Sequence, residues 1–143
     1  MSRAPLAAAF ALLVGLTAVP AVSAAPADAA LRFGQALESG LEDDLRSALP
    51  NGGRIDLGLD ALGAMDGEYG VRQVRAALSQ FLSEGHVRNF RIVKERRSES
   101  AAWLTAHLVI HEPGGRIRNR ALDLRYRLER NEWVLRTIRE RDP

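Results

Sequence analysis

The chain has 143 residues, of which 46% are hydrophobic, and this length and composition are typical of one small folded domain. It has no cysteine, which excludes disulfide bonds, thiol catalysis and a lipid anchor attached through cysteine. The formal net charge of +2 is too small to predict a nucleic-acid-binding protein.

Residues 1–24 predict a secretory signal peptide. A positive charge at Arg3 precedes a long apolar run, and Val22-Ser23-Ala24 supplies the small residues of a cleavage site. A membrane anchor is the alternative, but the apolar stretch over 4–19 is shorter than the roughly 20 residues that span a bilayer. We therefore expect an exported protein (periplasmic or secreted), with one mature domain over 25–143 and no membrane span after cleavage.

The first part of the mature domain predicts two helices and a short strand. Apolar residues recur at steps of three and four over 30–41, and we expect Asp28 to cap this helix and Gly40 to end it. The acidic run 42–44 predicts the start of a short second helix, because acids favour the positive end of the helix dipole. The alternation of apolar and polar residues over 55–59 predicts a strand.

The middle of the chain predicts a loop and then a third helix. The stretch 60–70 holds three glycines and is expected to be a loop. The clearest amphipathic pattern of the chain follows over 71–82. After Gly85 the apolar spacing changes from helical to alternating and stays so to the end.

The second half of the mature domain predicts four strands. Apolar residues alternate around 90–92, over 102–110, over 122–128 and over 133–138. A turn at 112–115 separates the second strand from the third. The expected fold is α+β, with helices packed on a curved antiparallel sheet.

The alternation also predicts which residues face each other, because a slip of one residue would expose the leucines to water. Pairing Leu104 with Leu124 places all the leucines of these two strands on one face. Asp123 and His107 then lie on the opposite face. The face expected to contact the helices offers no side chain that could abstract a proton near neutral pH, so we predict no catalytic residue.

The last two strands predict a tight hairpin and a β-bulge. Arg130-Asn131 fits a two-residue turn, across which Leu128 faces Trp133. Ile138 is then out of phase by one residue, which predicts a bulge near 136–137 that curls the final strand.

The order helix, short helix, short strand, helix and long antiparallel meander is similar to that of the nuclear-transport-factor-2-like (cystatin-like) superfamily, whose members are cone-shaped. A second resemblance rests on Gly40, Leu45, Ile55, Leu57, Tyr69, Gln73, Leu78, Phe81 and the closing segment 133–139. With these residues the chain resembles the secreted bacterial family called domain of unknown function 4783. The resemblance covers residues 28–140. It implies a pocket between the sheet and the helices, and it carries no established activity.

Four residues are predicted to line that pocket. Tyr126 is the side chain with a polar tip on the expected inner face of the meander, together with Trp133, and Tyr69 and Gln73 are expected to join them from the other half of the domain. A small apolar ligand held by the tyrosine hydroxyl is one interpretation. The alternative is that the polar tips reach the rim or bond to the backbone, as buried tyrosines commonly do.

Five arginines predict a positive rim for an anionic partner: Arg88, Arg91, Arg116, Arg118 and Arg120. Their aliphatic stems can cover the apolar mouth of the cone. The alternative is a solvated sheet edge, whose charges deter aggregation between strands.

No metal, cofactor or nucleic acid is predicted. His107 and His111 have the spacing of a helical metal pair, but four residues of a strand span roughly 13 Å, too far for one ion. We expect a non-catalytic binding or interaction module for a small apolar ligand or a protein partner, as a monomer or weak homodimer. A pocket enzyme of the isomerase or hydrolase type is the alternative, and it requires an inward carboxylate or histidine.

Overall fold

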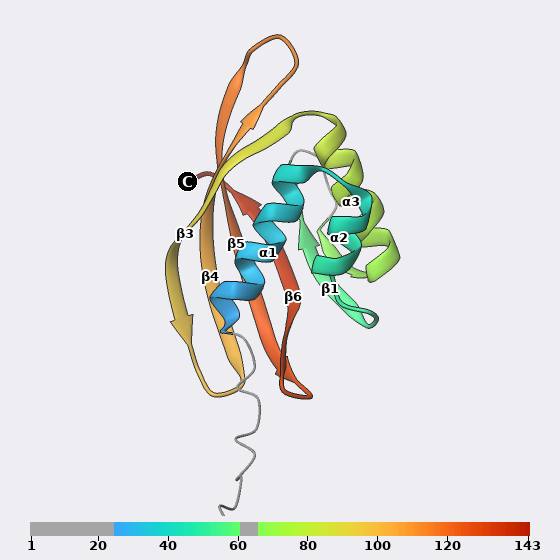
Figure 1. The fold of residues 1–143 in the computed structure, drawn as a ribbon, viewed down its shortest axis with the longest axis vertical. Coiled ribbons are helices and arrows are strands. Elements are labelled where there is room, and N and C mark those ends of the chain that lie inside the picture. Colours follow the sequence, from blue (N-terminus) through green and yellow to red (C-terminus); the bar gives the residue numbers. More distant parts are fainter. Residues whose placement is uncertain (1–24, 61–65) are drawn as a thin grey trace, which may run out of the picture.

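The computed structural model describes residues 25–60 and 66–143, which form three helices and a six-stranded sheet (Figure 1). The predicted signal peptide, residues 1–24, lies outside the described residues. Within the described ranges, no helix has the length and hydrophobicity needed to cross a membrane. The elements are α1 (Pro26–Ser39), α2 (Glu42–Ala48), β1 (Arg54–Gly58), β2 (Gly67–Gly70), α3 (Val71–Ser83), β3 (His86–Arg97), β4 (Ala101–His111), β5 (Ile117–Glu129) and β6 (Glu132–Arg141).

The sheet has the strand order β2-β1-β6-β5-β4-β3. The four long strands form an antiparallel meander, and β1 extends it by pairing with β6 in the parallel direction. The predicted α+β class with helices on a curved sheet is confirmed. The sheet is mixed rather than wholly antiparallel, because β1 and β6 run the same way. In Figure 1, α1 lies across the meander, while α2 and α3 lie beside β1.

The predicted register between β4 and β5 is confirmed. Leu104 pairs with Leu124 and Thr105 pairs with Asp123. Leu104, Leu108, Leu122 and Leu124 are buried in an apolar core together with Phe33 of α1, and Leu128 is partly buried against it. The apolar pattern therefore selected the face that the helices cover.

The predicted hairpin and bulge between β5 and β6 are also confirmed. Arg130 and Asn131 both have positive φ angles, 50° and 61°, as a two-residue turn of this kind requires. Arg125 pairs with Thr137, but its neighbour Tyr126 pairs with Leu135. Residue 136 is therefore the extra residue of a β-bulge, and β6 bends there.

Asp28 caps the start of α1 as predicted, but from within the first turn, because Ala25 occupies the N-cap position and Pro26 begins the helix. Asp28 accepts a hydrogen bond from the Ala25 backbone N–H (3.2 Å). The predicted loop 60–70 is wrong in part. Its end is a strand, β2, and residues 61–65 lie outside the described residues.

Helix α1 approaches β3 closely through Gly34. A Cβ atom at this position would lie 2.1 Å from Cδ1 of Phe90, so only glycine leaves room for the ring. The Phe90 backbone N–H donates to the Glu38 carboxylate on the same helix (2.8 Å). These contacts fasten α1 to the edge strand of the sheet.

We predict that Gly34→Ala destabilises the fold. Alanine ordinarily stabilises a helix interior by about 0.5–1 kcal/mol relative to glycine, but here the methyl group collides with the Phe90 ring, and overpacking costs about 1–3 kcal/mol. Urea denaturation of the mature domain measures the difference in the free energy of unfolding between Gly34→Ala and the parent.

The matched control is Gln35→Ala at the neighbouring exposed position, which should not destabilise the fold. The double variant Gly34→Ala/Phe90→Ala should recover part of the stability lost in Gly34→Ala, measured against Phe90→Ala alone. A single Gly34→Ala variant more stable than the parent would contradict this packing.

Candidate functional site

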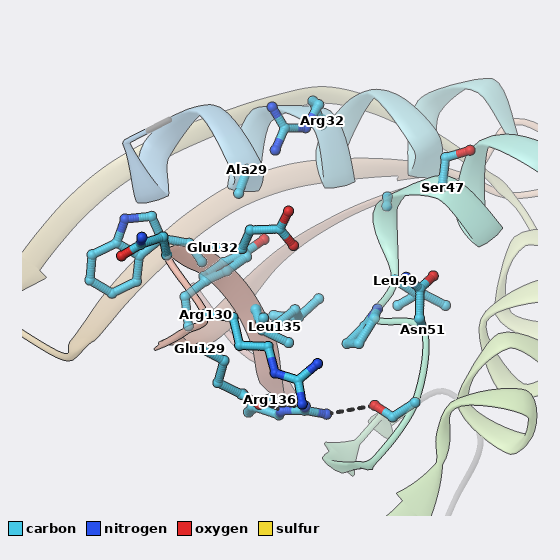
Figure 2. Close-up of a pocket in the computed structure, with 17 residues that line it drawn as sticks. Ala29, Arg32, Ser47, Leu49, Asn51, Glu129, Arg130, Glu132, Leu135 and Arg136 are labelled. Carbon is cyan, nitrogen blue, oxygen red and sulfur yellow. Dashed lines mark hydrogen bonds and ion pairs between the residues drawn. The ribbon is translucent and has the colours of Figure 1, made fainter. Parts of the chain in front are cut away.

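A pocket lies between α1 and the β5–β6 hairpin. It has a volume of about 970 Å³ and is open to solvent. Figure 2 shows Arg32 on the helix side of this pocket, and Arg130, Glu132 and Arg136 on the hairpin side. The pocket is lined by Ala29, Arg32, residues 47–52, Tyr126 and residues 129–136.

Two residues at this pocket carry buried polar atoms without a partner. Tyr126 and Trp133 are only 2% and 9% exposed. Neither the Tyr126 hydroxyl nor the Trp133 Nε1–H makes a hydrogen bond with the described part of the chain. Tyr126 pairs with Leu135, which is two residues beyond Trp133. Tyr126 and Trp133 are therefore diagonal neighbours on the inner face, and the backbones of such neighbours are roughly 7–8 Å apart. Leaving a polar group buried and unpaired costs about 1–3 kcal/mol.

Burial raises the pKa of the Tyr126 phenol well above its ordinary value, because the phenolate would lose its hydration. The positive charge of Arg32 acts in the opposite direction and lowers that pKa, but by less. The hydroxyl is therefore neutral at physiological pH and can donate a hydrogen bond. Arg32 is exposed on α1 and lines the pocket.

An arginine covers the Trp133 indole. The guanidinium of Arg97, from the end of β3, lies 5.2 Å from the ring centroid, within the range of a cation–π contact. This contact holds the indole ring in place and leaves its N–H group free to serve another acceptor.

The bulge residue Arg136 fastens the hairpin to the rest of the domain. Its guanidinium donates to both carboxylate oxygens of Glu129 (2.8 and 2.9 Å) and to the carbonyl oxygen of Gly52 (2.9 Å; Figure 2). The hydrogen bond from Arg136 lowers the pKa of Glu129 below its ordinary value. Glu129 is therefore a weaker base than an ordinary carboxylate, and its first role is to hold this wall of the pocket.

Of the four predicted pocket residues, the structure brings Tyr126 and Trp133 together and places the other two elsewhere. Tyr69 lies on β2 opposite Ile55, half-buried against the core. The Gln73 side chain accepts a hydrogen bond from the Gly70 backbone N–H (3.2 Å) at the start of α3. Neither residue lines the large pocket.

His107 and Asp123 lie on the outward face, as the register predicts. The carboxylate of Asp123 accepts hydrogen bonds from Thr105 Oγ1 (2.9 Å) and Arg141 Nε (2.7 Å). His107 pairs with Ala121 of β5 and does not line the large pocket. Within the described ranges, no three His, Cys, Asp or Glu side chains are grouped so that they could hold a metal ion.

The outward face carries a smaller recess of about 420 Å³, beside an exposed tryptophan. The Trp103 ring has Arg96 at 5.2 Å and Arg125 at 5.4 Å from its centroid. Trp103 pairs with Arg125 of β5, and the two side chains make a cation–π contact across the strands.

The five rim arginines lie in two places. Arg88 and Arg91 pair with Val109 and His107, residues whose side chains alternate with the buried ones of β4. Of the other three, Arg116 directly precedes β5 and Arg118 and Arg120 lie in it, where Arg120 pairs with the buried Leu108.

The three arginines at β5 are neutralised by acids. Arg116 and Arg118 both contact Glu112. Arg120 is buried and donates to Glu140 (2.7 Å), Asp60 (2.6 Å) and Asp142. This cluster ties the start of β5 to the end of β6 and to the segment after β1. The binding of an anionic partner at these residues stays a prediction.

Solved structures with this architecture share little sequence with the chain. One of them is a protein from Thiobacillus denitrificans, described as a candidate calcium/calmodulin-dependent protein kinase type II association domain. It has a TM-score of 0.67 and 18% identity over 83% of this chain and 95% of its own. A DUF4783 family protein from Bacteroides uniformis has a TM-score of 0.61 and 14% identity over 79% and 95% of the two chains. A protein of the NTF2-like family from Streptomyces avermitilis, described as a candidate dehydratase, has a TM-score of 0.60 and 14% identity over 80% and 90%.

These similarities show that the chain has the nuclear-transport-factor-2-like fold. The resemblance to this superfamily and to domain of unknown function 4783 is confirmed at the level of the fold. The sequence matches no protein-family model and no curated protein.

The buried phenol predicts a loss of stability at alkaline pH. The folded state keeps the Tyr126 proton at a pH where the unfolded chain has lost it. The resulting stabilisation is complete below pH of about 10, the ordinary tyrosine pKa, and is lost as the pH rises through the higher pKa of the folded state. Above pH 10 the free energy of unfolding should fall by about 1.4 kcal/mol per pH unit from this group alone.

Denaturation midpoints of the parent and of Tyr126→Phe, measured from pH 8 to 12, isolate this contribution. In the Tyr126→Phe variant, the free energy of unfolding should fall less steeply above pH of about 10 than in the parent. An equal fall with pH in both proteins would show that the phenol ionises as readily in the folded state as in the unfolded chain. The Tyr69→Phe variant is the matched control, since the sequence holds only these two tyrosines.

Proposed function

We propose that this chain, which has the nuclear-transport-factor-2-like fold, is an exported, non-catalytic binding module. The proposed binding site is the pocket between α1 and the β5–β6 hairpin. One observation carries the proposal: Tyr126 and Trp133 line the pocket and each has a buried polar atom without a partner.

Binding a ligand would satisfy both polar atoms. Buried hydroxyl and indole N–H groups in folded proteins nearly always have a hydrogen-bond partner. Tyr126 and Trp133 are adjacent on one face, but their polar atoms are fully buried, so a ligand reaches both only if neighbouring side chains at the pocket move aside. Pockets of about this volume are common among small-molecule sites, which combine apolar walls with a few polar groups.

The carboxylates at the pocket do not favour catalysis. Glu129 is held by Arg136, and this ion pair keeps its pKa low. Glu132 is exposed at the hairpin, without the enclosure that general bases in pocket enzymes have. Asp123 and His107 lie on the far face of the sheet. The alternative function is a pocket enzyme of the isomerase or hydrolase type. The Streptomyces protein is described as a candidate dehydratase, which is a lyase, so that description favours an enzyme on this fold but not that reaction type.

The export half of the proposal rests on residues 1–24. Their positive start, apolar run and small residues before position 25 are the features that a secretion pathway recognises. The absence of cysteine means that the domain can fold in an oxidising compartment without forming disulfide bonds.

We predict that the mature domain, purified without denaturation, carries a small molecule that native mass spectrometry can detect. The Tyr126→Phe/Trp133→Phe double variant should lose it, because both hydrogen-bonding atoms are removed while the aromatic volume is largely kept. Trp103→Phe, on the outward face, is the matched control and should retain the ligand. The proposal fails if the parent is empty and shows no binding to a library of small organic compounds.

We also predict that the full chain expressed in a bacterium is recovered outside the cytoplasm as a shortened protein. Intact-mass measurement should place its new N-terminus close to residue 25, and deletion of residues 1–24 should retain the protein in the cytoplasm. An intact, full-length chain in the cytoplasm would contradict export.

A further inference from the structure

The pocket has an excess of positive charge. Three arginines line it, and Arg136 is neutralised by Glu129. Arg32 and Arg130 make no ion pair with the described part of the chain and face one remaining carboxylate, Glu132, which makes none either. Figure 2 shows Arg32 on α1, across from Arg130 and Glu132 on the hairpin side.

The unpartnered polar atoms require an acceptor. The Trp133 indole can only donate a hydrogen bond, and the neutral Tyr126 hydroxyl can donate one as well. Arg32 is near enough to the phenol for its charge to act on it. Two donors beside an unpaired cation match a group that has two acceptor oxygens and a negative charge.

The remaining walls are apolar or small. Leu49 and Leu135 are buried at the pocket, and Ala29 and Ala48 line it from α1 and α2. Such walls favour a hydrocarbon portion over a second charged group. The apolar walls would therefore contact the hydrocarbon part of a ligand, while Tyr126, Trp133 and Arg32 would contact its polar group.

We propose that the pocket binds a small organic anion, with one carboxylate directed to Tyr126, Trp133 and Arg32 and an apolar body against the leucines. This inference rests on the proposed binding function and names the chemical class of its ligand. All three residues contact the carboxylate: Tyr126 and Trp133 donate hydrogen bonds to it, and Arg32 compensates its charge.

Binding can be measured with Trp133 as the fluorescent reporter. The sequence has two tryptophans, so Trp103→Phe leaves Trp133 as the single emitter. In this background, octanoate should bind and change the emission, and octan-1-ol, which has the same chain without the charge, should bind about tenfold more weakly. Arg32→Gln should weaken octanoate about fivefold without affecting the alcohol, and Arg32→Lys should restore most of the loss. Arg46→Gln, on the exposed face of α2, is the matched control.

The outcomes separate the two proposals. Binding of octanoate that depends on Arg32 and weakens with added salt supports the carboxylate site. Equal binding of octanoate and octan-1-ol, unaffected by Arg32→Gln, overturns the anionic ligand class and leaves the apolar pocket standing. Failure of both probes, together with an empty native protein, overturns the binding function itself.

Discussion

The phase of strand β5 determines what this molecule can do. Its residues alternate between the helix-covered face and the outward face, so Leu124 and Tyr126 are buried while Asp123 lies outward. A shift of one residue would expose the leucines and enclose the carboxylate. The hydrophobic effect therefore sets the register, and the register places Asp123 and His107 on the outward face. Two ionisable groups of the meander, Arg120 and Glu140, are nevertheless buried and pair with each other. Glu140 lies opposite the buried Leu122, so the inner face holds a carboxylate that the alternation did not predict, although Glu140 does not line the pocket beside Tyr126 and Trp133.

The β-bulge at Arg136 lies in one wall of the proposed binding site. One extra residue bends β6, and it lines the pocket together with residues 129–135 before it. The same residue carries the guanidinium that joins Glu129 to Gly52. Arg136 thus both bends β6 and attaches the hairpin to the segment before β1. Trp133 lies on the inner face beside Tyr126.

The sequence predicts the parts of the structure that follow from alternation and turn chemistry. The pairing of Leu104 with Leu124, the Arg130-Asn131 turn and the bulge all come from local patterns combined with burial. β2 has two glycines in four residues and no apolar alternation, so nothing local marks it as a strand. Tyr126 and Trp133 were found as pocket residues because their face is predictable. Arg32 was not, because its position at the pocket depends on how α1 packs on the sheet.

The central claim is that the Trp133 indole N–H and the Tyr126 hydroxyl, which have no hydrogen-bond partner within the described residues, form hydrogen bonds with a bound ligand. The most direct test is a proton–nitrogen NMR spectrum of the two indole groups in natively purified mature domain, before and after organic extraction of bound small molecules. The account predicts that the Trp133 resonance shifts when the ligand is removed while the Trp103 resonance stays in place. An unchanged Trp133 resonance, in a protein shown to release nothing on extraction, would contradict it.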